Sequence, residues 1–185
     1  MGFFDALFGR TKIPAGKTDQ IFAIATAAID IETKLNTPFS GRAGIILRSV
    51  DNSSYEAIQR DLDDILKMSG QDMPVTAHMQ ADGLGFTWII FEGTAIDGVI
   101  NALHLSADMV KQAGYSDTLL AALFGFAGWY LVYSYRRATF YPFVPQGTRK
   151  RDASREFRLA STLKPSLPME QDTDRWYPIW DVPFS

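Results

Sequence analysis

Three stretches of the chain carry apolar residues at the spacing that places them on one face of an α-helix. The first spans Asp19–Asn36, and the second opens at Ser53, whose spacing to Glu56 is that of a capping box. The third opens at Thr94 and ends at Gly114. This spacing predicts three amphipathic helices, each with one side in the core. Their inward-facing residues are Ile21, Ile24, Ala25, Ala28, Ile31 and Leu35, then Tyr55, Ile58, Leu62 and Ile65, then Ile96, Val99, Ile100, Leu103, Ala107 and Val110.

The remaining apolar runs are shorter and are bounded by turn residues, so they predict about five β-strands. The strongest turn signal is Asp82-Gly83, inside the predicted hairpin Val75–Phe91. The last two predicted strands are joined at Ala127-Gly128. They are apolar on both faces, which predicts a place in the middle of the sheet. The strands expected outside the first hairpin are Gly44–Val50, Thr118–Phe126 and Trp129–Phe140.

This order of elements predicts an α+β fold, a mainly antiparallel sheet of about five strands with helices packed on one face. A chain of 185 residues is long enough for one buried core, so one domain is expected. We assign residues 1–12 to a short amphipathic N-terminal helix and residues 13–185 to a single domain with an aromatic C-terminal tail. The apolar and aromatic side chains of Arg175–Phe184 have to be buried, on this domain or on a partner.

Composition narrows the function classes only a little. The formal net charge of −3 gives no overall attraction to nucleic acid or to anionic lipid. The chain has no cysteine, which excludes disulfides, thiolate nucleophiles and thiolate metal sites and fits a reducing cytoplasm. No uncharged apolar run of about 18 or more residues occurs, so no transmembrane helix is expected. The first residues also lack the basic and apolar regions of a secretory signal.

No catalytic motif occurs in the sequence, so we expect a protein that is not an enzyme and has no cofactor and no metal. The two histidines, His78 and His104, lie in different predicted elements and lack the spacing of metal ligands. A hydrolase would need one of them to meet an acid and a nucleophile in space, and no spacing in the sequence predicts that meeting.

The first segment of the chain has an aromatic face. Four apolar side chains fall together on a helical wheel, with Asp5 opposite them. Such a helix could rest on a membrane surface, or it could dock on its own domain or on a partner. The residues of this predicted binding face are Phe3, Phe4, Leu7 and Phe8.

A basic cluster is the second candidate binding region. It lies mainly in a predicted helix, Arg149–Leu163, and it includes Arg136 and Arg137 on the strand before it. The interleaved aromatic residues Tyr133, Tyr135, Phe140 and Tyr141 suggest single-stranded nucleic acid, while the charge also suits an acidic partner or lipid head groups. For Arg136 and Arg137 we favour pairing with carboxylates such as Asp174 or Asp181, which would hold the tail. The helix-region residues of the predicted binding cluster are Arg149, Lys150, Arg151, Arg155 and Arg158.

Several blocks together resemble one protein family. They are MGFFDALFGRTK at the start, DGLGFTW, AGYSDTLLAALFGF, LVYSYRRATFYPFVP, and DTDRWYPIWDVPF at the end. In this order they resemble the PspAB family, the phage-shock-protein-A-associated proteins, over nearly the whole chain. TFYPF and RWYPIW are the most specific blocks.

The resemblance implies a non-enzymatic adaptor or accessory protein of the phage-shock membrane-stress response. Its implied partner is PspA, and its implied location is the cytoplasm, with possible peripheral contact at the inner face of the cell membrane. The order of elements also resembles the type III secretion chaperone-like fold, which serves protein binding. Nucleic-acid binding through the cluster around Arg149–Arg158 is the alternative function. The sequence makes no prediction of the oligomeric state.

Overall fold

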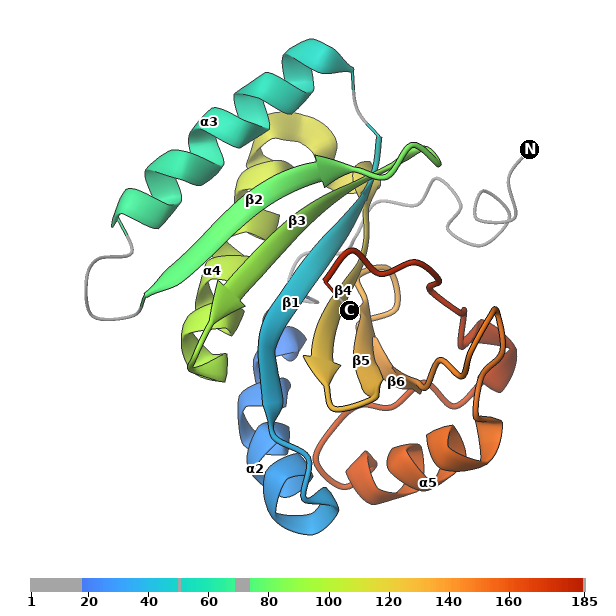
Figure 1. The fold of residues 1–185 in the computed structure, drawn as a ribbon. Coiled ribbons are helices and arrows are strands. Elements are labelled where there is room, and N and C mark those ends of the chain that lie inside the picture. Colours follow the sequence, from blue (N-terminus) through green and yellow to red (C-terminus); the bar gives the residue numbers. More distant parts are fainter. Residues whose placement is uncertain (1–17, 50, 69–73, 185) are drawn as a thin grey trace.

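The centre of the protein is one six-stranded sheet. The computed structural model describes residues 18–49, 51–68 and 74–184 (Figure 1). The strand order is β2-β3-β1-β4-β5-β6, and every neighbouring pair is antiparallel. The predicted α+β fold with a mainly antiparallel sheet is confirmed, with six strands in place of about five. The strands are β1 (Phe39–Arg48), β2 (Val75–Ala81), β3 (Phe86–Gly93), β4 (Leu119–Phe126), β5 (Trp129–Ser134) and β6 (Thr139–Phe143).

The additional strand comes from the region predicted as one long strand, Trp129–Phe140. The chain turns back after Ser134 through four residues, and Ala138 N–H donates to the carbonyl of Ser134 at 2.8 Å. Ala138 closes the turn in the left-handed region, with φ of 56°. Because glycine or asparagine usually occupies such a position, the alanine gave no turn signal.

Four α-helices among the described residues pack on one face of the sheet, as predicted. The core on this helix face joins residues of all four helices to inward-facing residues of the sheet. Figure 1 shows α4 behind the central strands, with α3 beside β2. A 3₁₀ turn, η1 (Thr18–Phe22), leads into the first of them. The helices are α2 (Ala23–Leu35), α3 (Asn52–Met68), α4 (Ile96–Val110) and α5 (Ala153–Leu163).

Two helix starts differ from the prediction. Asp51 caps α3, because its carboxylate accepts the N–H of Ser54 at 2.9 Å and the hydroxyl of Ser53 at 2.6 Å. The helix therefore begins one residue before Ser53. For α4 the N-cap is Ala95, without a side-chain hydrogen bond, so Thr94 does not cap it.

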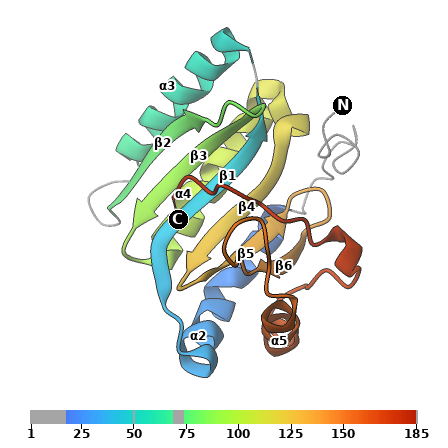
Figure 2. The same ribbon diagram turned by 45° about the vertical axis from the view of Figure 1, so that its right-hand side comes forward.

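The C-terminal segment covers the opposite face of the sheet. Figure 2 shows it crossing in front of the central strands, on the side away from α4. It forms a second core there, the tail-face core, with residues of the five strands β1, β3, β4, β5 and β6. The aromatic tail is thus buried on its own domain. Its buried side chains are Trp176, Ile179, Val182 and Phe184.

Phe184 shows how closely the tail approaches the strands. Its ring makes edge contacts with Trp88 and Tyr130, with ring centroids 6.1 and 6.0 Å apart. A Cβ atom at Gly44 of β1 would lie 2.7 Å from this ring. The missing side chain at Gly44 therefore provides the space in which Phe184 packs.

Candidate functional site

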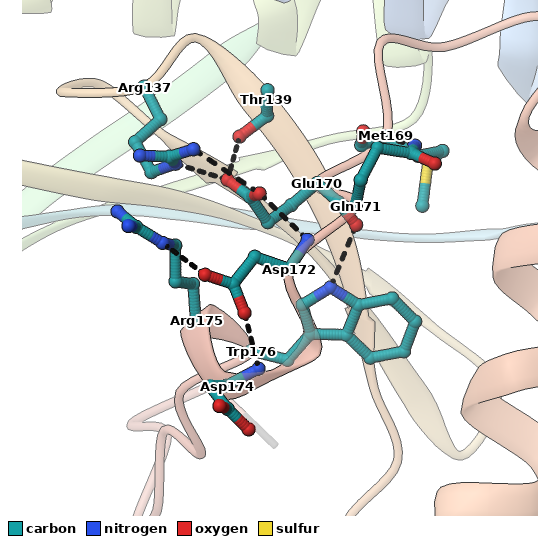
Figure 3. Close-up of polar contacts among 9 residues, drawn as sticks. All are labelled: Arg137, Thr139, Met169, Glu170, Gln171, Asp172, Asp174, Arg175 and Trp176. Atoms are coloured by element: carbon teal, nitrogen blue, oxygen red, sulfur yellow. Dashed lines mark hydrogen bonds and ion pairs between the residues drawn. The ribbon is translucent and has the colours of Figure 1, made fainter.

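A polar cleft of about 450 Å³ opens between the β5–β6 turn and the C-terminal segment. We call it the arginine cleft, because three arginines line it. Two regions far apart in the sequence meet there, and their carboxylates and guanidinium groups alternate (Figure 3). The strands and their turn contribute Ala121, Ser134, Arg136, Arg137, Thr139 and Tyr141, and the later segment contributes Glu170, Asp172, Asp174, Arg175 and Tyr177.

Glu170 is the buried centre of this arrangement, with 4% of its surface exposed. Its carboxylate forms an ion pair with Arg137 through Nε and also accepts from Nη2 at 3.4 Å. The hydroxyl of Thr139 and the N–H of Asp172 donate to it as well, each at 3.1 Å. Burial alone would raise the pKa of Glu170, but these hydrogen bonds outweigh burial and leave the pKa below its ordinary value.

A second pair lies next to the first. Arg175 donates from Nε to the carboxylate of Asp172 at 2.6 Å, and the N–H of Asp174 donates to the other oxygen at 3.2 Å. The hydrogen bond from Arg175 keeps the pKa of Asp172 below its ordinary value. The charge of Arg137 acts on Asp172 in the same direction, so the two ion pairs form one network.

The network fixes the beginning of the tail. The indole N–H of Trp176 donates to the carbonyl of Glu170 at 3.0 Å, as Figure 3 shows. On the strand side, the hydroxyl of Tyr141 donates to the carbonyl of Tyr177 at 3.1 Å. These hydrogen bonds hold the residues that line the cleft against one another and against β6.

The predicted role of the arginine pair is confirmed for Arg137, with a different partner. Arg137 pairs with Glu170, not with Asp174 or Asp181 as expected. Asp181 instead lies 3.5 Å from Arg149. No pattern in the sequence marked Glu170, because a single buried carboxylate has no periodic signal.

The predicted basic helix is shorter than expected. Asp152 caps α5 by accepting the N–H of Arg155 at 2.9 Å, so the helix begins at Ala153 and not at Arg149. Of the predicted binding residues, Arg149, Lys150 and Arg158 are exposed, and Arg155 is half-buried. The structure thus places four of the five cations at or near the surface around the start of α5.

Arg151 has a structural environment that the sequence did not indicate. Its Nε donates to the buried carboxylate of Glu156 at 2.8 Å, and its Nη1 donates to the carbonyl of Trp176 at 2.5 Å. Glu156 also accepts the N–H of Val144 at 2.8 Å. This buried pair joins α5, the end of β6 and the tail.

The aromatic residues that suggested base stacking are buried. Tyr133 and Phe140 have no exposed surface, and Tyr135 and Tyr141 have 1% and 3% exposed. Bases cannot stack on them in this fold, so the stacking part of the nucleic-acid hypothesis has no support. The other predicted binding residues, Phe3, Phe4, Leu7 and Phe8, lie outside the described residues.

The two histidines lie on opposite faces of the sheet. His78 is exposed on β2 and pairs with Ile90, whose side chain belongs to the tail-face core. His104 lies on α4, where its Nε2 is 3.2 Å from the Asp108 carboxylate. Within residues 18–49, 51–68 and 74–184, no three His, Asp or Glu residues are grouped so that they could hold a metal ion.

None of the helices in these ranges is long and apolar enough to cross a membrane.

The fold is that of a single-sheet α+β protein with helices on one face and an extended segment on the other. The chain belongs to the PspAB family, since the family model described as PspA associated protein B matches residues 1–184. This match confirms the resemblance of the sequence blocks. No curated protein and no solved structure matches the chain significantly, so the expected likeness to the type III secretion chaperone-like fold is not confirmed.

Proposed function

We propose that the protein is a non-enzymatic accessory protein that binds PspA in the phage-shock membrane-stress response. The observation that carries the proposal is the family match over residues 1–184, because the family is described by its association with PspA. The protein would act in the cytoplasm and, through its partner or its first helix, at the inner face of the membrane. Residues 1–12 would be a helix separate from the single domain of residues 13–185.

Two surfaces would make the contacts. The first is the aromatic face formed by Phe3, Phe4, Leu7 and Phe8, which suits an apolar groove or a lipid surface. The second is the basic region at the start of α5. Arg149 has 68% of its side chain exposed, and Lys150 and Arg158 are exposed as well, which suits an acidic partner surface. Arg151 would not contact the partner itself; its ion pair with the buried Glu156 would hold the start of α5 in place.

The experiment is a pull-down with PspA and a vesicle flotation assay, run with the full chain. Phe4→Asp/Phe8→Asp tests the first surface. Leu84→Asp is its control, because Leu84 is also apolar, is 70% exposed and lies on another part of the protein, between β2 and β3. Arg149→Glu/Arg158→Glu tests the second surface, and its control is Arg60→Glu on the exposed side of α3. Circular dichroism checks that all variants fold.

We expect each double variant to weaken PspA capture about tenfold or more while the controls bind normally. Unchanged capture by both double variants would contradict the proposed surfaces. Absence of capture by the wild-type chain would contradict the proposed function. The alternative, nucleic-acid binding by charge alone, predicts binding to single-stranded DNA that weakens steeply with salt and is lost in Arg149→Glu/Arg158→Glu.

A further inference from the structure

We propose that the arginine cleft binds a phosphate group between the guanidinium groups of Arg137 and Arg175. This inference goes beyond PspA binding and rests on the cleft alone. The cleft has a volume of about 450 Å³, and the surrounding chain is fixed by hydrogen bonds to the sheet and the tail. It is therefore large enough and ordered enough to hold a small anion or a lipid head group.

The buried carboxylate of Glu170 uses its full acceptor capacity within the protein. Both oxygens of Glu170 accept two hydrogen bonds each, from Arg137, Thr139 and the N–H of Asp172. Each oxygen of Asp172 accepts one. A carboxylate oxygen has two lone pairs, so Glu170 is fully satisfied and acts as a support that orients Arg137.

The arginines keep unused donors. Arg137 binds Glu170 through Nε and Nη2, and Arg175 binds Asp172 through Nε. The Nη1 group of Arg137 and both Nη groups of Arg175 make no hydrogen bond to the described residues. The hydroxyl of Ser134, which also lines the cleft, makes none to them either. The cleft therefore offers more hydrogen-bond donors than its own acceptors use.

The direction of these donors favours one anion. Figure 3 shows the guanidinium groups of Arg137 and Arg175 on the same side of the two carboxylates. Two cations held side by side in this way attract an anion that can bind both. A phosphate group has oxygens in several directions and can accept from two arginine forks and a hydroxyl, whereas a planar carboxylate can match only one fork well.

Asp174 limits the affinity. Its carboxylate lines the cleft and is exposed, and its side chain makes no ion pair among the described residues. A negative charge at this place opposes a bound phosphate. Removal of this charge should therefore strengthen binding, in the opposite direction to removal of an arginine.

The test is an NMR titration of the full chain with inorganic phosphate at low ionic strength, which follows the arginine Nε–H signals. We expect saturable shifts for Arg137 and Arg175. Arg175→Gln should weaken the apparent affinity for phosphate about tenfold, because it removes a charged hydrogen bond. Asp174→Asn should strengthen the apparent affinity several-fold. Arg158→Gln, an exposed arginine on α5, is the control that should behave as wild type.

Flotation with phosphatidylglycerol vesicles separates the two sources of phosphate. If inorganic phosphate inhibits vesicle binding and Arg175→Gln abolishes it, the phosphate that the cleft binds belongs to a lipid head group. Vesicle binding unaffected by Arg175→Gln, together with saturable phosphate shifts, would assign a soluble phosphate compound. The proposal is overturned if wild type shows no saturable response, or if folded Arg175→Gln binds phosphate as tightly as wild type. None of these outcomes depends on PspA.

Discussion

The two faces of the sheet are covered in different ways. On the helix face, amphipathic helices supply a continuous core, and each is a regular element with its own backbone hydrogen bonds. On the tail face, one irregular segment covers the strands with Trp176, Ile179, Val182 and Phe184. An irregular segment cannot satisfy its own polar groups, so it needs partners in the rest of the fold.

Ion pairs of two buried carboxylates contribute to this attachment. Glu170 binds Arg137 from the β5–β6 turn, and Glu156 binds Arg151, which in turn holds the carbonyl of Trp176. The arginine cleft is thus a consequence of the tail's attachment. No helix covers the tail face, so a polar network holds the irregular segment in place there. That network leaves arginine N–H donors at the surface.

The largest effect is expected for Trp176→Ala. Trp176 is 6% exposed, contacts Phe157, and holds the tail through its indole N–H. Removal of this ring should lower the free energy of unfolding by about 3–5 kcal/mol, the usual cost of deleting a buried large aromatic side chain. Chemical denaturation measures it, with exposed Leu105→Ala on α4 as the control. A loss below about 1 kcal/mol would show that the tail is not an integral layer.

The next effect is expected for Gly44→Ala. The backbone of Gly44 is not in the left-handed region, so the cost comes only from the added methyl group, which meets Phe184. Overpacking of this kind should cost about 1–3 kcal/mol. In the double variant Gly44→Ala/Phe184→Leu the two costs should not add, because the smaller side chain leaves room. Additive free energies of unfolding would contradict the contact.

On the helix face, Asp51→Ala should cost about 1 kcal/mol through loss of the α3 cap. Asp61→Ala, exposed within the same helix, is the matched control and should stay within about 0.5 kcal/mol of wild type. Thermal denaturation of both variants measures the difference. Equal stability of the two variants would contradict the assignment of Asp51 as the cap.

The smallest expected effects are on the pH dependence of stability. The two buried carboxylates, Glu170 and Glu156, should change the free energy of unfolding in opposite directions as pH falls. The pKa of Glu170 is below its ordinary 4.5, so its contribution to stability is present above that pH and is lost as pH falls through the lowered pKa. Burial raises the pKa of Glu156, against hydrogen bonds from Val144 and Arg151, so its contribution grows as pH falls towards 4.5.

Denaturation at several pH values between about 3 and 6.5 separates the two groups. Glu170→Gln should make the acid-induced loss of stability shallower than in wild type, and Glu156→Gln should make it steeper. The same change of slope in both variants would contradict the opposite pKa shifts.

Much of the fold could be predicted because its helices and most strands are periodic. The spacing of Ile24, Ile31 and their neighbours places α2 on the sheet, and Asp82-Gly83 marks the β2–β3 hairpin. The β5–β6 turn could not be predicted, since Ala138 adopts a left-handed conformation that its residue type does not favour. The burial of the tail followed from its composition, but the face it covers did not.

The arginine cleft was only partly predictable. Arg136 and Arg137 stood out as charges in an apolar run, and the expectation that they hold the tail is met by Arg137. Arg175 and Asp172 lie three residues apart in a short 3₁₀ turn, which a sequence pattern does not distinguish from a solvated pair. Glu170 and Glu156 are buried by tertiary contacts alone, and no local signal reports such contacts.

The proposed association with PspA is tested most directly by hydrogen–deuterium exchange of the full chain with and without PspA. We expect slower exchange in residues 2–12 and in the segment Arg149–Arg158, with unchanged exchange in β4, whose residues are all buried. No change of exchange at a saturating concentration of PspA, or protection confined to other surfaces such as α3, would contradict it.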